Sequence, residues 1–160
     1  MNMTTQVKRT DHIFREDMDC NALMRNVMKM GRDEFIKELL DSGLKGRGGA
    51  GFPTGLKWKI VKEAKDDAKY VICNADEGEP GTFKDREILD KACDKVVWGM
   101  ALAAYIVGAK EGFIYLRAEY KFLSTKLKIA IDKMDNHLNT LGINFKLGMV
   151  YGAGAYICGE

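Results

Sequence analysis

The sequence is poor in the residues that build metal sites and has no strong charge of either sign. Among its 160 residues are four cysteines and two histidines. No two cysteines form a C-x-x-C pair, so we expect no metal site built from this chain. Lys and Arg number 25 against 23 Asp and Glu, a formal net charge of +2. This balance provides no basic field, and we expect no nucleic-acid partner.

Long apolar segments are also missing. The longest apolar run, Val96 to Ala109, includes Gly99 and Gly108 and is shorter than the roughly 20 residues of a membrane-spanning helix. We interpret it as a buried helix and expect no membrane span. Residues 1–12 are polar and lack the apolar core of a secretory signal. The expected location is therefore the cytoplasm, either free or at the cytoplasmic face of a membrane complex.

What the sequence does contain is the periodicity of an ordinary globular domain. Hydrophobic residues make up 46% of the chain and charged residues 30%, and the length is sufficient for one core. Four-residue spacing from Asp85 to Tyr105 indicates one long buried helix or two consecutive ones. Apolar periodicity predicts further helices near residues 23–30, 35–40, 53–65 and 120–134, and strands at residues 70–73, 113–116 and 145–151.

The order strand, helix, strand, helix, strand predicts an α/β fold. Right-handed crossovers of this kind produce parallel neighbours. We expect a Rossmann-like parallel sheet flanked by helices on both faces and preceded by a short helical N-terminal segment. The predicted division is an N-terminal arm with short helices at residues 1–42 and an α/β domain at residues 43–160.

A glycine-rich stretch, from Gly43 to Trp58, follows the second predicted helix and includes the start of the third. Glycine leaves the backbone uncovered, and a loop of bare N–H groups followed by a helix from Pro53 suits a phosphate or a flat polar ring. A sharp structural turn is the alternative. The pattern Gly46-x-Gly48-x-x-Gly51 matches the dinucleotide fingerprint formally, but a helix precedes it where that fingerprint requires a strand.

Two further loops follow predicted strands and should meet at the carboxyl edge of the sheet, where open α/β sheets bind ligands. One covers residues 74–82 and the other residues 152–160. The first contains Asp76, Glu77 and Glu79, which would repel a phosphate but accept hydrogen bonds from sugar hydroxyls or an amide. This pattern suits a ribityl chain or a nicotinamide, whereas the alternative is a solvated turn.

Residues 43–58, 73–86 and 152–160 together resemble the flavin-carrying, NADH-oxidising (51 kDa-type) subunit of respiratory complex I. Similar subunits occur in NAD-coupled and electron-bifurcating hydrogenases and in NAD-dependent formate dehydrogenases. The resemblance runs from about Leu39 to Glu160, and its three motifs appear in the family's order. It implies an oxidoreductase that binds FMN and NAD and transfers a hydride from NADH to FMN. Electrons would then pass singly to iron–sulfur clusters.

The resemblance also implies the site residues, none of them a nucleophile or acid. The glycine loop would line the nucleotide site, with Phe52 stacking on the nucleotide and Lys57 placing a cation beside the flavin or the nucleotide. Asn74, Asp76 and Glu77 would hold the flavin, and Glu79, after Gly78, would lie near the nicotinamide. The third loop would close the site through Tyr156, Gly159 and Glu160. The glycine-loop residues are Gly46, Arg47, Gly48, Gly49, Ala50, Gly51 and Phe52.

The sequence departs from the family pattern at its C-terminal end, where it stops at Glu160 inside the third motif. We expect a truncated α/β domain that is weakly active or inactive alone. In the relatives a [4Fe–4S] cluster lies on a later segment, and the expected partners are iron–sulfur electron-transfer subunits of a larger complex. Ala118 and Ile60 replace a glycine and an aromatic of the relatives. The alternative function is a non-enzymatic nucleotide-binding or assembly module.

Overall fold

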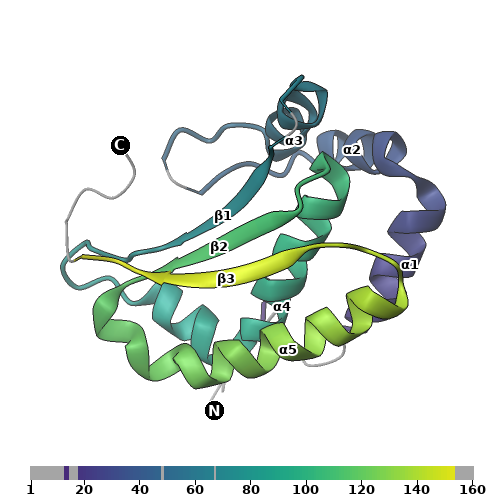
Figure 1. Cartoon of the computed structure of the whole chain (residues 1–160). Helices are drawn as coiled ribbons and strands as arrows, with labels where there is room; N and C mark the ends of the chain where they lie inside the picture. The colour runs from purple at the N-terminus through teal and green to yellow at the C-terminus, as the bar shows by residue number, and fades with distance from the viewer. Residues whose placement is uncertain (1–12, 15–17, 48, 67, 154–160) are drawn as a thin grey trace, which may run out of the picture.

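The computed structural model describes residues 13–14, 18–47, 49–66 and 68–153. Helices and strands alternate along the second half of the chain, as Figure 1 shows. Three helices come first, then the strands and their crossovers. In chain order the elements are α1 (Cys20–Met30), α2 (Arg32–Asp41), α3 (Thr54–Glu63), β1 (Tyr70–Ala75), α4 (Lys84–Val107), β2 (Glu111–Leu116), η1 (Ala118–Leu123), α5 (Ser124–Thr140) and β3 (Lys146–Tyr151).

The three strands form one parallel sheet in the order β1-β2-β3. Both pairings are in register along their full length, from Tyr70 beside Glu111 to Leu116 beside Tyr151. Helices flank this sheet, so the predicted α/β class is confirmed. Strand β1 continues two residues past its predicted end at Cys73, and the helix predicted near residues 120–134 begins as the 3-10 helix η1 before α5.

One detail of the predicted fold is wrong for the described residues, because the crossover helices cover a single face of the sheet. Figure 1 shows α4 and α5 together on one side. On the opposite face Tyr70 is 53% exposed and Ile72 is 67% exposed, and the ring of Tyr70 stacks on that of Phe113. Both crossovers step in the same direction along the sheet, and right-handed connections then put both helices on the same side.

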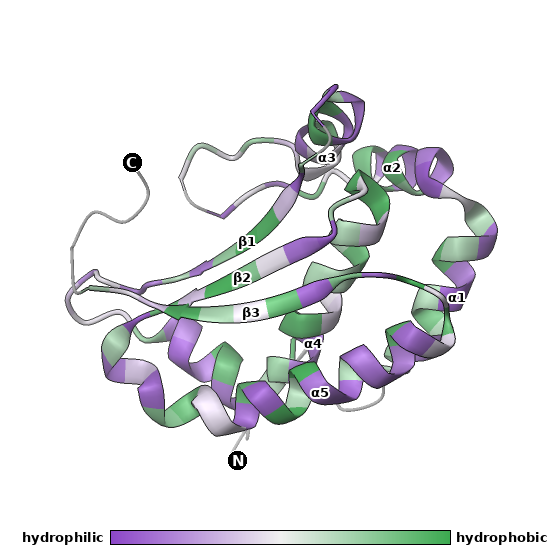
Figure 2. Cartoon of the chain, in the orientation of Figure 1, coloured by the Kyte–Doolittle hydropathy of each residue, from purple (hydrophilic) through white to green (hydrophobic). Residues whose placement is uncertain are grey.

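Helix α4 is the centre of the core, and it is two helical stretches joined at Ala92. Ala92 has φ −142° and ψ 32°, which lie outside the helical region. The predicted four-residue spacing is seen in the buried residues of α4, among them Leu89, Val97 and Ala101. In Figure 2 hydrophobic residues predominate in the second half of α4, whereas hydrophobic and hydrophilic residues alternate along α5. Within the described ranges, no helix has the length and apolar character needed to cross a membrane.

The N-terminal helices pack against α3 and α4. Asp19 caps α1 by accepting a hydrogen bond from the N–H of Ala22 at 2.9 Å, which satisfies one of the free donors of the first turn. Val27 and Ile36 form a small apolar cluster with Ile106 of α4. The predicted division of the chain between residues 42 and 43 stays a prediction.

Candidate functional site

The three strands end side by side, so the segments that follow them begin at one place. Ala75, Leu116 and Tyr151 are aligned across the sheet. The ladder continues one residue further, because the N–H of Arg117 donates to the carbonyl of Ala75 at 3.0 Å and that of Gly152 to the carbonyl of Leu116 at 2.8 Å. The carboxyl edge therefore brings three loops together.

The acidic loop, residues 76–83, has a defined backbone. The N–H of Gly78 donates to the carbonyl of Asp76 at 2.9 Å, and that of Thr82 to the carbonyl of Glu79 at 3.1 Å. Gly81 has φ +81° and follows Pro80, which is the pattern of a type II turn. This turn leaves the Glu79 side chain at the surface, where the Thr82 hydroxyl donates to it at 3.4 Å.

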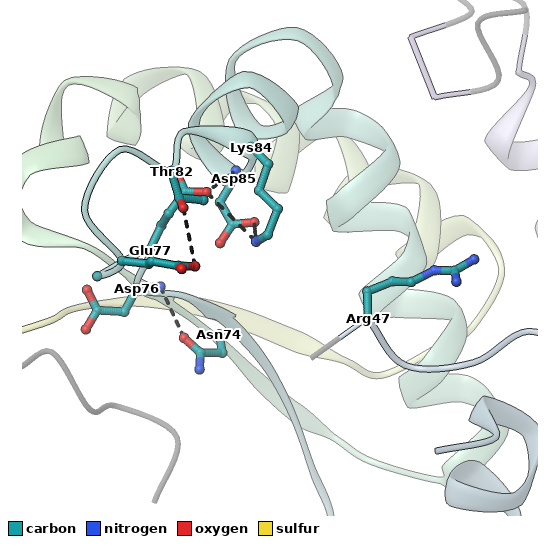
Figure 3. Close-up of a pocket in the computed structure, with 9 residues that line it drawn as sticks. Arg47, Asn74, Asp76, Glu77, Thr82, Lys84 and Asp85 are labelled. Carbon is teal, nitrogen blue, oxygen red and sulfur yellow. Dashed lines mark hydrogen bonds and ion pairs between the residues drawn. The ribbon is translucent and has the colours of Figure 1, made fainter. Parts of the chain in front are cut away.

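An open cavity of about 430 Å³ lies against the acidic loop and α4. Six residues predicted as cofactor ligands line it, namely Arg47, Asn74, Asp76, Glu77, Gly78 and Glu79. Thr82, Lys84 and Asp85 complete the lining. In Figure 3 the Arg47 side chain stands across the cavity from the carboxylates and extends away from them. The glycine loop and the acidic loop thus share one cavity, although the cofactor role of each residue stays a prediction.

The glycine loop is closed at its base like a hairpin. Lys45 and Pro53 form an antiparallel bridge, and the N–H of Gly46 donates to the carbonyl of Phe52 at 2.8 Å. Near the tip, Gly49 and Gly51 have φ values of +96° and +60°, a region that residues with a side chain rarely adopt. Figure 1 shows this loop extending alongside β1 toward the carboxyl edge.

Other predicted residues do not belong to the lining of this cavity. Among the described residues of the glycine loop, Arg47 lines it, whereas Gly46, Gly49, Ala50, Gly51 and Phe52 do not. The ammonium of Lys57 lies 5.9 Å from the centre of the Phe52 ring, so these two residues form a pair on the glycine-loop side. Gly48, Tyr156, Gly159 and Glu160 lie outside the described residues.

Glu77 differs from its acidic neighbours because its side chain turns inward and caps α4. It is 5% exposed. Its carboxylate accepts hydrogen bonds from the N–H groups of Asp85 and Arg86 at 2.9 and 3.4 Å and from the hydroxyl of Tyr120 at 2.8 Å. The helix has no side-chain cap of its own at Phe83, so Glu77 satisfies two of the free N–H groups of the first turn.

Burial of Glu77 favours its protonated form, but its hydrogen bonds outweigh this effect. The donors from Asp85, Tyr120 and Arg86, together with the nearby Lys84 ammonium, hold the pKa of the Glu77 carboxyl below its ordinary value. The Tyr120 hydroxyl responds in the opposite sense. Burial and the adjacent Glu77 carboxylate raise the pKa of Tyr120, so it stays a donor at neutral pH.

The lowered pKa of Glu77 predicts an acid-sensitive contribution to stability. Because the folded chain binds this proton less tightly than the unfolded chain, the contribution is complete above the ordinary pKa of about 4.3 and is lost as pH falls through the lower folded pKa. We expect Glu77→Gln to reduce the free energy of unfolding by about 1–3 kcal/mol at pH 7. Urea unfolding measured between pH 3 and 7 should show that this difference shrinks in acid.

The matched control for this measurement is Glu63→Gln at an exposed ion pair with Lys59, where N and O are 3.9 Å apart. We expect it to change stability by less than about 0.5 kcal/mol. A gap between wild type and Glu77→Gln that stays constant down to pH 3 would contradict the assignment.

Asp76 and Gly152 provide a test of whether the residues present suit a flavin. Among the described residues, Oδ2 of Asp76 is buried without a hydrogen-bond partner. A methyl group on Gly152 would lie 3.2 Å from Cγ and both oxygens of that carboxylate, so glycine leaves room beside it. A buried carboxylate oxygen needs a donor, and hydroxyls or ring N–H groups of a flavin are donors of this kind. The residues fit.

Sequence reasoning overlooked the segment that follows β2. Arg117 and Tyr120 both contact Glu77, and neither was predicted as a site residue. The guanidinium of Arg117 donates to the carbonyl of Glu77 and to the carboxylate of Glu119 at 2.9 Å. Their position directly after the predicted middle strand could have identified them, because that strand ends at the same edge as the other two.

The arrangement favours hydroxyl and amide donors over a phosphate at the start of α4. In Rossmann domains the N-terminus of a helix commonly binds phosphate, but here Glu77 occupies those N–H groups. Lys84 is a cation at this point, and its ammonium lies 2.6 Å from Asp85 and 3.9 Å from Glu77. A parallel α/β sheet with such a cavity at its carboxyl edge is typical of domains that bind nucleotides or flavins.

Comparison with known families places the chain within this class. Residues 39–160 match the family model described as the Nuo51 FMN-binding domain. The chain therefore belongs to the family of FMN-binding domains found in the flavin subunits of complex I and NAD-reducing hydrogenases. This confirms the resemblance expected from the three motifs, and FMN is the cofactor of the family.

Similar proteins come from two kinds of complex. The chain is 45% identical over 154 residues to the NAD-reducing hydrogenase HoxS subunit alpha of Cupriavidus necator, covering 92% of this chain and 26% of that protein. It is 43% identical over 145 residues to the mitochondrial NADH dehydrogenase (ubiquinone) flavoprotein 1 of Dictyostelium discoideum, covering 85% of this chain and 30% of that protein.

A solved structure is similar as well. The chain superimposes on the crystal structure of an NAD+-reducing [NiFe]-hydrogenase in the H2-reduced state with a TM-score of 0.86 and 38% sequence identity, covering 95% of this chain and 27% of that chain. The chain thus spans less than a third of the length of the relatives named here.

Proposed function

We propose that this chain forms the FMN- and NADH-binding part of an NADH:acceptor oxidoreductase, within residues 43–160, with residues 1–42 as an N-terminal arm. The observation that carries the proposal is the cavity at the carboxyl edge, which Arg47 of the glycine loop lines together with Asn74, Asp76 and Glu79. The names of the relatives support NAD as the second ligand, since one is an NAD-reducing hydrogenase and another an NADH dehydrogenase.

A bound flavin would supply a ring that takes a hydride from a nicotinamide and releases electrons singly to iron–sulfur clusters of partner subunits. The role of this chain is to bind the flavin and the nicotinamide nucleotide and to orient their rings. Asp76 and Asn74 would accept hydrogen bonds from the flavin, and Glu79 would accept one from the amide of the nicotinamide. Lys57 and Phe52 hold the nucleotide on the glycine-loop side. Holding the two rings in contact would increase the rate of hydride transfer through proximity rather than through acid–base chemistry.

The test is a titration of the purified chain with FMN, followed by quenching of flavin fluorescence and then by anaerobic addition of NADH. We expect binding that is weaker than in a full-length relative, because this chain spans less than a third of the length of those relatives. Asp76→Asn should reduce the affinity for FMN by about tenfold, because it removes the charge that receives a hydroxyl or ring N–H.

The matched control is Asp132→Asn on the exposed side of α5, where the Asp132 carboxylate pairs with Lys128 at 3.3 Å. It should bind FMN like the wild type. Equal affinity in Asp76→Asn and the wild type would remove Asp76 from the site. A chain that shows no quenching at any FMN concentration would contradict the proposed function.

A non-enzymatic assembly module is the second candidate, and the open face of the sheet supports it. Ile72 is the most exposed large hydrophobic residue in the described part of the chain, at 67%, and both faces of a parallel sheet are normally covered. The FMN titration separates the candidates. A module of this kind would keep the fold and bind a nucleotide or a partner without becoming yellow, whereas the flavin domain would acquire flavin absorbance.

A further inference from the structure

Glu77, Arg117 and Tyr120 form a cluster, here named the clamp, that joins the acidic loop to the segment after β2. Tyr120 donates from its hydroxyl to Oε2 of Glu77 at 2.8 Å. The guanidinium of Arg117 donates to the carbonyl of Glu77, and its backbone N–H donates to the carbonyl of Ala75 at 3.0 Å. The acidic loop is therefore held at its beginning and at its second residue.

The carboxylate of Glu77 accepts its hydrogen bonds from groups of the protein itself. Its two carboxylate oxygens receive three donors, from Asp85, Arg86 and Tyr120, and the side chain is 2% exposed. Asp76 differs, because in the described residues its buried Oδ2 has no partner. The two neighbouring carboxylates thus have different tasks, since only Asp76 has a buried oxygen left for a ligand.

We propose that Tyr120 and Arg117 are positioning residues of the flavin site, which act through Glu77 to fix the acidic loop so that Asp76 and Glu79 face the ligand. This inference rests on the proposed function and deepens it. The resemblance implies that Glu77 binds the flavin directly. This inference instead gives Glu77 the role of holding the acidic loop in place. The clamp thus fixes the positions of Asp76 and Glu79, which are not themselves part of it.

The first variant to examine is Tyr120→Phe. It removes the hydroxyl but keeps the ring, which packs edge to face against Phe122 with centres 6.2 Å apart. A buried carboxylate loses one of three donors, so we expect the affinity for FMN to fall about tenfold. Tyr105→Phe is the control, because Tyr105 lies near the C-terminal end of α4 and its ring faces Arg32. This control should bind FMN like the wild type.

Arg117 provides the second variant and a conservative rescue. Arg117→Ala removes the donor to the Glu77 carbonyl, and we expect about a tenfold loss of FMN affinity. Arg117→Lys keeps a cation that can reach a carbonyl oxygen, although it lacks the fork of the guanidinium. It should recover part of the lost affinity, whereas no recovery would argue against the carbonyl contact.

The pH profile of FMN affinity distinguishes positioning from a general loss of structure. Because the Tyr120 hydroxyl helps to lower the pKa of Glu77, its removal should move the acid limb of the profile to higher pH. A general loss of structure would lower the whole profile without moving this limb. The residues with titratable or charged side chains that contact Glu77 or act on its charge are Lys84, Asp85, Arg86, Arg117 and Tyr120. Asp76 and Glu79 line the same cavity, and Glu119 pairs with Arg117. Each of these groups is unchanged in the Tyr105→Phe control.

Hydrogen exchange without FMN separates this inference from the proposed function. We expect the amides of residues 76–86 to exchange about tenfold faster in Tyr120→Phe and Arg117→Ala, and at the wild-type rate in Tyr105→Phe. Unchanged exchange would overturn the clamp. Faster exchange with unchanged FMN affinity would overturn the positioning role. A wild type that exchanges slowly in this segment but binds no FMN would overturn the proposed function while the clamp stands.

Discussion

Gly152→Val is expected to reduce the affinity for FMN by about 10- to 100-fold, because its side chain would enter the space beside Asp76. Even the first carbon of a side chain at residue 152 would lie 3.2 Å from the carboxylate of Asp76. The backbone of β3 ends one residue earlier, at Tyr151, so the sheet itself should persist. Fluorescence quenching of FMN, with circular dichroism to verify the fold, measures this effect.

Gly152→Ala and Gly99→Ala are the controls for that result. Gly152→Ala adds the close contact without the branches of valine and should give a smaller loss. Gly99 lies on the exposed side of α4, and within the described chain a methyl group there meets no atom within 4 Å. It should leave FMN binding unchanged. Wild-type affinity in Gly152→Val would mean that the end of β3 is not part of the flavin site.

Leu127→Ala is expected to have the largest effect on stability. Leu127 is 0% exposed and belongs to the main core, where α5 packs against α4 and the sheet. Truncating a buried leucine removes apolar contacts and leaves a cavity, which costs about 2–5 kcal/mol. This is a large part of the roughly 5–15 kcal/mol that stabilises a typical domain. Urea unfolding should show a lower midpoint with an unchanged slope.

Ile129 on the same helix is the matched control because its side chain is 52% exposed. Ile129→Ala removes an aliphatic group of the same size from solvent-exposed surface and should change stability by less than about 0.5 kcal/mol. If the two variants unfold at the same denaturant concentration, α5 does not pack as described.

The elements of the sheet were predictable because their patterns are local. Alternation from Phe145 to Tyr151 and the apolar run from Tyr70 indicate strands from neighbouring residues alone. The true end of β1 was not predictable in this way. Asn74 and Ala75 extend the strand because they pair with Tyr115 and Leu116 of β2, and asparagine has little preference for strands.

The candidate site was predicted in its outline but not in the roles of its members. Asp76, Glu77 and Glu79 are equivalent in a sequence, and all were expected to face a ligand. Glu77 turns inward because the free N–H groups of α4 and the hydroxyl of Tyr120 satisfy its charge. Tyr120 stands 43 positions later. Such a partner becomes apparent only when the order of the strands places β2 beside β1.

In the described part of the chain, the face of the sheet opposite α4 and α5 carries exposed apolar side chains. Tyr70, Ile72 and Phe113 keep water in contact with an apolar surface that parallel sheets usually sandwich between layers. Removing such a surface from water contributes a favourable free energy of about 25 cal/mol for each Å² that is buried. Assembly on this side can therefore be driven by dehydration, without long-range attraction between opposite charges.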